Sequence, residues 1–152
     1  MSLEEALQEL REYCRGMPPV AAMQVEVAGM EGDALRLTAP LSANVNDKGN
    51  AFGGSLTSLM TVSGWGLVTL KLQLAGLKAE VYVADSHVRY LAPLYGDLVA
   101  EAAFAEGQSW DTFIDTLVQR GRARIQVEAR VLLPEGGLAT TLGGRFVAIA
   151  KR

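Results

Sequence analysis

The chain has 152 residues, of which 49% are hydrophobic and 20% are charged, proportions that are ordinary for a compact globular protein and exclude an intrinsically disordered chain. With 14 basic and 17 acidic residues the net charge is −3, so no overall positive field would attract nucleic acid. One cysteine, Cys14, and one histidine, His87, leave neither an internal disulfide nor a Cys/His cluster for a structural metal, and we expect no metal.

An amphipathic helix is predicted at residues 2–15. Ser2 and Glu5 have the spacing of a capping box, and Pro18 and Pro19 cannot continue the helix. Apolar residues recur along one face at Leu3, Leu7, Leu10 and Cys14. The segment is acidic where a secretory signal peptide would be basic, so we expect the protein to stay in the cytoplasm.

Two short alternating stretches follow, the first with Met23, Val25 and Val27 and the second with Leu35 and Leu37. The turn residues "GMEGD" separate them, so the sequence predicts a β-hairpin.

A run without charged residues extends from Gly49 to Leu70. It has the length of a membrane span, but only ten of its 22 residues are apolar and five are glycine, so we expect no membrane crossing. From Gly54 to about Leu74 the apolar residues occur all round the helical wheel. That pattern predicts a long helix covered by protein on every side.

The remaining sequence predicts four strands and a short helix. Period-2 alternation places Val83, Asp85, His87 and Arg89 on one face of a strand that ends before Pro93. A second strand follows in "DLVAEAAFAEG", and then a helix that Ser109 can cap. The clearest alternation, residues 124–133, and the segment "TTLGGRFVAIA" predict a last pair of strands.

One long apolar helix with six strands to cover it indicates an α+β fold, in which a curved antiparallel sheet wraps around the helix of residues 54–74. We expect residues 1–152 to form a single domain.

The segment "NVNDKGNAFGGSL", followed at a distance by "RYLAP", resembles the hotdog-fold acyl-CoA thioesterases. More closely, "NVN", "AFGGSL", "GWG" and "RYLAP" look like the thioesterase domain that some bacteria carry fused behind a GNAT-type acetyltransferase. The resemblance covers nearly the whole chain. It implies a hotdog fold, a homodimer or dimer of dimers, and a small-molecule acyl-CoA or an acyl carrier protein as substrate.

The resemblance also implies roles for the residues around the two glycines. In related thioesterases the backbone amide in the place of Gly53 holds the oxyanion, which suits the unpaired N–H groups at the start of a helix. Asn46 occupies the loop position that orients a water or the carbonyl. The alternative is that Gly53 and Gly54 only allow helix and sheet to pack closely. The predicted substrate-binding residues are Phe52, Gly54, Ser55, Thr61, Trp65, Val83 and Arg89.

The general base is left open by the sequence. Related enzymes have a carboxylate at the position of Asn46 or at the position of Thr61, and neither is acidic here. One substitute is Asp47 in the loop, although a solvated loop aspartate is the more common situation. The other is His87 oriented by Asp85, because imidazole exchanges protons readily near neutral pH. The alternative for this second group is a structural network at a subunit interface.

We therefore expect hydrolysis of an acyl thioester without a cofactor. A non-catalytic acyl-thioester-binding or interaction protein is the alternative, since both standard carboxylates are missing. An acyl-thioester hydratase or dehydratase is a second alternative on the same fold.

Overall fold

A computed structural model describes residues 1–151, and Arg152, the last residue of the predicted domain, lies outside the described residues. The helices are α1 (Leu3–Gly16), α2 (Pro18–Ala22), a 3₁₀ turn (Leu41–Ala43), α3 (Gly53–Leu74) and α4 (Trp110–Arg120). The strands are β1 (Glu26–Glu31), β2 (Ala34–Ala39), β3 (Ala79–Tyr90), β4 (Leu98–Phe104), β5 (Arg122–Leu132) and β6 (Leu138–Ala150).

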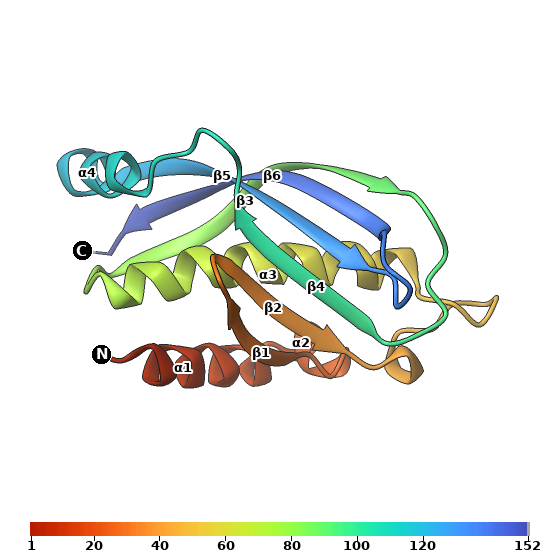
Figure 1. The fold of residues 1–152 in the computed structure, drawn as a ribbon. Coiled ribbons are helices and arrows are strands. Elements are labelled where there is room, and N and C mark those ends of the chain that lie inside the picture. Colours follow the sequence, from red (N-terminus) through yellow and green to blue (C-terminus); the bar gives the residue numbers. More distant parts are fainter. Residues whose placement is uncertain (152) are drawn as a thin grey trace.

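All strands join one antiparallel sheet in the order β1-β2-β4-β5-β6-β3. The sheet curves over α3, and α1 lies on the other side of α3 (Figure 1). The predicted α+β arrangement is thereby confirmed. The predicted central helix is also confirmed, and it begins one residue earlier than expected, at Gly53.

The helix α3 is buried on several sides but not on every side as predicted, since Ser58 is exposed and Val62 and Trp65 are only half-buried. Leu59, Met60 and Leu67 are fully buried, and each such side chain contributes about 1.5–3 kcal/mol relative to an exposed position. Two glycines let neighbouring elements approach the helix axis. A Cβ on Gly64 would lie 2.7 Å from the ring of Phe146 in β6.

The N-terminal helix has the predicted capping box, in which Ser2 and Glu5 exchange hydrogen bonds between side chain and backbone. Its buried face includes Leu7, Leu10 and Cys14, whereas Leu3, expected on the same face, is 45% exposed. Burial raises the pKa of the Cys14 thiol, which favours an unreactive packing role.

The hairpin of β1 and β2 is confirmed, but its first strand begins at Glu26 rather than near Met23. A short helix, α2, that the sequence did not predict occupies residues Pro18–Ala22, with proline in its first turn where the missing N–H costs nothing. Gln24 then has φ of +57°, which breaks the alternation before β1.

The short helix α4 begins at the predicted cap, where the Ser109 hydroxyl accepts a hydrogen bond from the Thr112 N–H. It lies beside the part of β5 that extends beyond β4 (Figure 1). The side chain of Gln108 accepts a hydrogen bond from the Gln126 N–H in β5. No helix within residues 1–151 is both long and apolar enough to cross a membrane.

Replacement of Gly64 by alanine tests the close contact between α3 and the sheet. The added methyl group would overlap the fully buried Phe146 ring, so we expect Gly64→Ala to lower the free energy of unfolding by about 1–2 kcal/mol despite the higher helix propensity of alanine. Gly16→Ala is the matched control, since its Cβ would meet nothing within 4 Å. Urea denaturation measures both. Equal stabilities of the two variants would contradict the prediction.

Candidate functional site

The loop of residues 44–52, which precedes α3, is held in place by a buried asparagine. The Asn44 side-chain amide donates hydrogen bonds to the carbonyls of Met23 and Pro40, and the Asn44 backbone carbonyl accepts one from the Phe52 N–H. The Ala51 N–H donates to the Leu94 carbonyl at 2.8 Å. The start of α3 is therefore held by backbone hydrogen bonds to both Asn44 and Leu94 in the absence of a ligand.

Asn46 uses its side chain to close this loop. Its carboxamide oxygen accepts hydrogen bonds from the N–H groups of Lys48 and Asn50, and its amide nitrogen donates to the Asn50 side chain at 2.6 Å. The neighbouring Asp47 side chain is 81% exposed and pairs only with Lys48, at 2.9 Å. Such an exposed pair holds a side chain weakly. Asn46 is thus a loop-forming residue in this structure, and Asp47 is solvated.

The first N–H groups of α3 are available to a ligand. Within residues 1–151, no acceptor receives a hydrogen bond from the N–H of Gly53, Gly54 or Ser55. The helix has no side-chain cap, because its N-cap residue is Phe52. The Phe52 ring is 53% exposed and folds over Gly54, where a Cβ would lie 2.5 Å from it. The start of α3 therefore has positively polarised backbone amides without acceptors, of which that of Gly53, a half-buried residue, is not under the Phe52 ring.

A tyrosine from β3 lies beside this helix start. The Tyr90 hydroxyl donates a hydrogen bond to the Gly53 carbonyl at 3.3 Å and lies 2.5 Å from the Thr57 hydroxyl, one turn into α3. One turn further, Thr61 donates its hydroxyl proton to the Thr57 carbonyl, so it is occupied within the helix. The side chains that hydrogen-bond at the start of α3 are therefore two hydroxyl groups, and no carboxylate within residues 1–151 bonds to Gly53 or Thr57.

The predicted face of β3 is wrong after Val83. A bulge at Ala84 shifts the pairing with β6, so that Val83 lies opposite Phe146, whereas Asp85 lies opposite the exposed Arg145. Directly paired residues of antiparallel strands share a face. Val83 therefore faces the same side as α3, but Asp85, His87 and Arg89 face the outer side of the sheet.

Asp85 is bound by arginine instead of orienting His87. The Arg145 guanidinium donates hydrogen bonds to both carboxylate oxygens, and this pairing lowers the pKa of Asp85 below its ordinary value. A carboxylate with a lowered pKa is a weaker base. His87 instead lines a hollow of about 480 Å³ on the outer face, together with Glu128 and Gly143.

The other predicted substrate-binding residues lie along α3. Ser55 is buried in the first turn, and Trp65 packs edge-on against Tyr13 of α1 with ring centroids 6.1 Å apart. No cluster of three or more His, Cys, Asp or Glu side chains suited to a metal ion is found in the described part of the chain.

Sequence reasoning missed the Tyr90–Thr57 hydroxyl pair. The "RYLAP" segment gave the position of Tyr90, but strict alternation did not indicate that its side chain would face the start of α3 beside Thr57. A one-residue bulge reverses every side chain beyond it, and nothing in "VADSHV" marks one.

Comparisons with known proteins identify the family and the fold. Residues 7–150 match the model of the family described as "Putative thioesterase (yiiD_Cterm)". A crystal structure of a protein of unknown function from Chlorobaculum tepidum is similar with a TM-score of 0.92 at 29% identity, covering 99% of this chain and 98% of that one. A putative thioesterase from Shewanella oneidensis gives 0.85 at 28% identity, with coverages of 96% and 99%.

A thioesterase from Haemophilus influenzae, at 18% identity, shares the fold with a TM-score of 0.73 and covers 95% of this chain and 90% of that one. The hotdog fold expected from the sequence is confirmed by these structures together with the sheet and helix described above.

Proposed function

Because the chain belongs to the thioesterase family whose model matches residues 7–150, we propose that it hydrolyses an acyl thioester at the N-terminus of α3. The observation that carries the proposal is that the Gly53 N–H has no acceptor within residues 1–151, while the Tyr90 hydroxyl, paired with that of Thr57, donates to the carbonyl of the same glycine. The proposal needs no metal or redox cofactor.

In the proposed reaction the thioester carbonyl oxygen accepts a hydrogen bond from the Gly53 N–H. Water attacks the carbonyl carbon, and the negative charge that forms on the oxygen is stabilised by this amide and by the partial positive charge at the helix start. The Tyr90 and Thr57 hydroxyls position the water, and Asp47 takes up its proton after its exposed contact with Lys48 opens and the side chain turns toward Gly53. Collapse of the tetrahedral intermediate breaks the C–S bond, and the leaving thiolate takes the proton held by Asp47, so that the acid and the carrier thiol are released.

A proline at position 53 tests the oxyanion donor. Gly53 is the first residue of α3, where proline is favoured, and the extended Phe52 (ψ 130°) can precede a proline. Gly53→Pro therefore removes the N–H while the helix start is kept. Gly53→Ala retains the N–H, and its Cβ would meet the Tyr90 ring at an ordinary 3.4 Å.

We expect Gly53→Pro to lower kcat/KM by about 10²–10³-fold, and Gly53→Ala to change it far less. Thiol release from short-chain, long-chain and aromatic acyl-CoAs measures both, and circular dichroism checks that each variant folds. On the same panel Asp47→Ala should lower the rate and His87→Ala should not. Equal losses in the Pro and Ala variants would contradict the oxyanion role of the Gly53 amide.

A non-catalytic acyl-thioester binder is the second candidate. Related enzymes have a carboxylate at the position of Asn46 or of Thr61, and here both side chains form hydrogen bonds within the protein. The Asn46 carboxamide closes its loop and the Thr61 hydroxyl bonds to the helix backbone. Binding of an acyl-CoA without thiol release would favour it. A hydratase is less well supported, because His87, the single histidine, faces away from α3.

We propose further that the active form is a homodimer joined through β3. This 12-residue strand is at the sheet edge and pairs only with β6, so its other side offers unpaired backbone groups. Its exposed apolar side chains include Tyr82, Val83 and Tyr90, which are 52%, 43% and 59% exposed. A second copy running antiparallel would cover both the edge and these side chains.

Val83→Asp tests this interface, because it would bury an unpaired carboxylate between two copies. We expect it to weaken self-association by roughly 10²–10³-fold. Val118→Asp is the control, since Val118 is 65% exposed on α4, away from β3. Sedimentation velocity over a concentration series measures both variants. A Val83→Asp protein that associates like the wild type would exclude pairing through β3.

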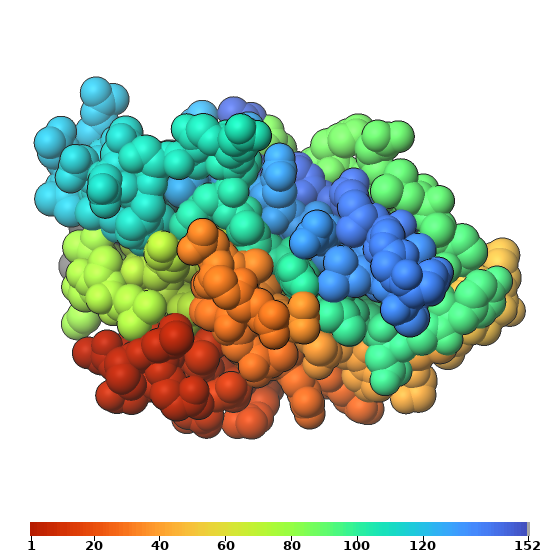
Figure 2. All heavy atoms as spheres, in the orientation of Figure 1, coloured from red at the N-terminus to blue at the C-terminus, as the bar shows by residue number. Residues whose placement is uncertain are grey.

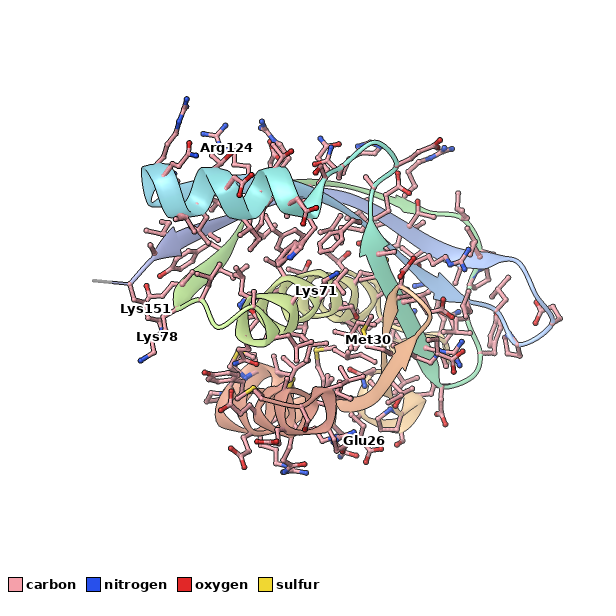
Figure 3. The ribbon with its side chains drawn as sticks, turned by 60° about the vertical axis from the view of Figure 1, so that its left-hand side comes forward. Glu26, Met30, Lys71, Lys78, Arg124 and Lys151 are labelled. Carbon is pink, nitrogen blue, oxygen red and sulfur yellow. The ribbon has the colours of Figure 1, made fainter. Side chains whose placement is uncertain are left out.

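The carrier that we propose is coenzyme A, because exposed cations gather where β6 ends and β3 and β5 begin. They are Lys78, Arg120, Arg122, Arg124 and Lys151. The Lys151 N–H donates to the Lys78 carbonyl and the Ala150 N–H to the Gly121 carbonyl, which joins the three segments. None of the five forms an ion pair with another described residue. Figure 3 shows Lys78 and Lys151 next to each other, with Arg124 farther away, beside α4.

These five cations form a basic end of the molecule that lies too far from Gly53 of the same chain to bind the same substrate. We therefore propose that they act on the substrate bound at the partner subunit. The 22 residues of α3 span about 33 Å, and the cations are at the end of α3 that is far from Gly53. If β3 pairs antiparallel with a second copy about its midpoint, Ala79 of one copy lies beside Tyr90 of the other. The basic end then borders the partner's helix start, where the phosphates of coenzyme A would be placed.

Charge reversal at Arg122 and Lys151 together tests the proposed carrier. We expect Arg122→Glu/Lys151→Glu to raise KM roughly tenfold for an acyl-CoA and to leave the N-acetylcysteamine thioester of the same acid unaffected, since that substrate has no phosphates. Arg15→Glu, an exposed cation on α1, is the control. Equal effects on the two substrates would argue against phosphate binding, and an effect confined to acyl carrier protein would identify a protein carrier.

A further inference from the structure

A second hollow lies at the far end of α3, separate from the proposed catalytic site. It has a volume of about 600 Å³ and is bordered by α1, the β1–β2 hairpin, the end of α3 and the segment that joins β4 to α4. Its apolar lining includes Leu3, Met30, Leu70, Leu74, Phe104 and Trp110. Figure 2 shows these four parts of the chain meeting at one face of the molecule. This volume and lining are typical of small-molecule sites.

The side chain of Lys71 contributes one positive charge to this apolar hollow. The Lys71 ammonium lies 5.4 Å from the ring centroid of Phe104 and 5.3 Å from that of Trp110, and the two rings stack 5.3 Å apart. Lys71 is half-buried and forms no ion pair with any residue from 1 to 151. In Figure 3 it lies between α3 and α4, and Met30 borders the same space from β1.

We propose that this hollow binds an amphiphilic carboxylate, with the carboxylate group on Lys71 and the hydrocarbon tail between the apolar side chains. A partly desolvated cation without a counter-ion gains from an anionic partner more than a fully solvated one does. Two exposed leucines at the rim, Leu3 (45%) and Leu74 (41%), supply apolar surface that a tail would cover. A neutral lipid would leave Lys71 unpaired.

The site is independent of the proposed thioesterase site. Lys71 is 18 residues from Gly53 along α3, or about 27 Å, and it faces β4 and α4 rather than β3. The other charged residue that lines the hollow is Asp33, at the hairpin tip. Because a carboxylate there repels an anionic ligand, its removal should have the opposite effect to removal of Lys71.

Tryptophan fluorescence tests the proposal. The chain has two tryptophans, so Trp65→Phe leaves Trp110 as the reporter within the hollow. Titration of this variant with decanoate should give a saturable change, and decanol, which has the same tail without the charge, should bind more weakly. We expect Lys71→Met in this background to weaken decanoate binding about tenfold and Asp33→Asn to strengthen it. Arg15→Met, which removes an exposed cation of α1 outside the hollow, should have no effect.

Amide chemical shifts of the same protein would locate the ligand. Shifts gathered at the end of α3 and at the hairpin tip would support the site, whereas shifts confined to the start of α3 would overturn it. Equal affinities for decanoate and decanol, equal affinities in the Lys71 and Arg15 variants, or no saturable signal would also overturn it.

Discussion

The structure depends on the close approach of the sheet to α3. A helix without charges along most of its length has no side chain that must reach water, so the sheet can close over it from β2 to β3. At Gly64 the approach is limited by the helix backbone itself, because the fully buried Phe146 ring occupies the place of a side chain. Strand β6, which carries Phe146, pairs with β3 on its other side. The position of β3, and of Tyr90 at its end, therefore follows from this contact.

The bulge in β3 then decides which residues can take part in chemistry at the start of α3. Without it, Asp85, His87 and Arg89 would share the face of Val83 and lie under the sheet, where three charged or polar groups in a row would be costly. With it, Asp85 pairs with Arg145 on the outer face, and Val88 and Tyr90 take the inner positions. The inserted Ala84 thus places Val88 and Tyr90 on the face of the sheet that covers α3. Asp85, His87 and Arg89 lie on the outer face instead.

Much of the fold could be predicted because it follows from patterns that reach over many residues. The uncharged run predicted α3 to within one residue, and strict alternation predicted β5 with its alternating burial. Short features could not be predicted in the same way. The helix of Pro18–Ala22 and the bulge at Ala84 each depend on a few backbone angles that the sequence pattern does not determine.

The candidate site could be predicted only in part, for the same reason. The two glycines and the resemblance located the helix start, which depends on the backbone, and the structure places uncovered amides there. The partners of those amides depend on side-chain direction. Asn46 turned inward to close its loop, and Tyr90 turned toward Gly53 because of a bulge 6 residues earlier in β3.

The two ends of α3 differ in what they can bind, and both differences arise from the helix itself. At the start, three N–H groups that have no acceptor within residues 1–151 add to the positive end of the helix dipole, which suits an oxyanion. At the other end the dipole is negative, and Lys71 in the last turn compensates it. A carboxylate near that end would be repelled by the helix carbonyls alone. The ammonium held over Phe104 and Trp110, on the side of α3 facing α4, is what would make an anionic ligand acceptable there.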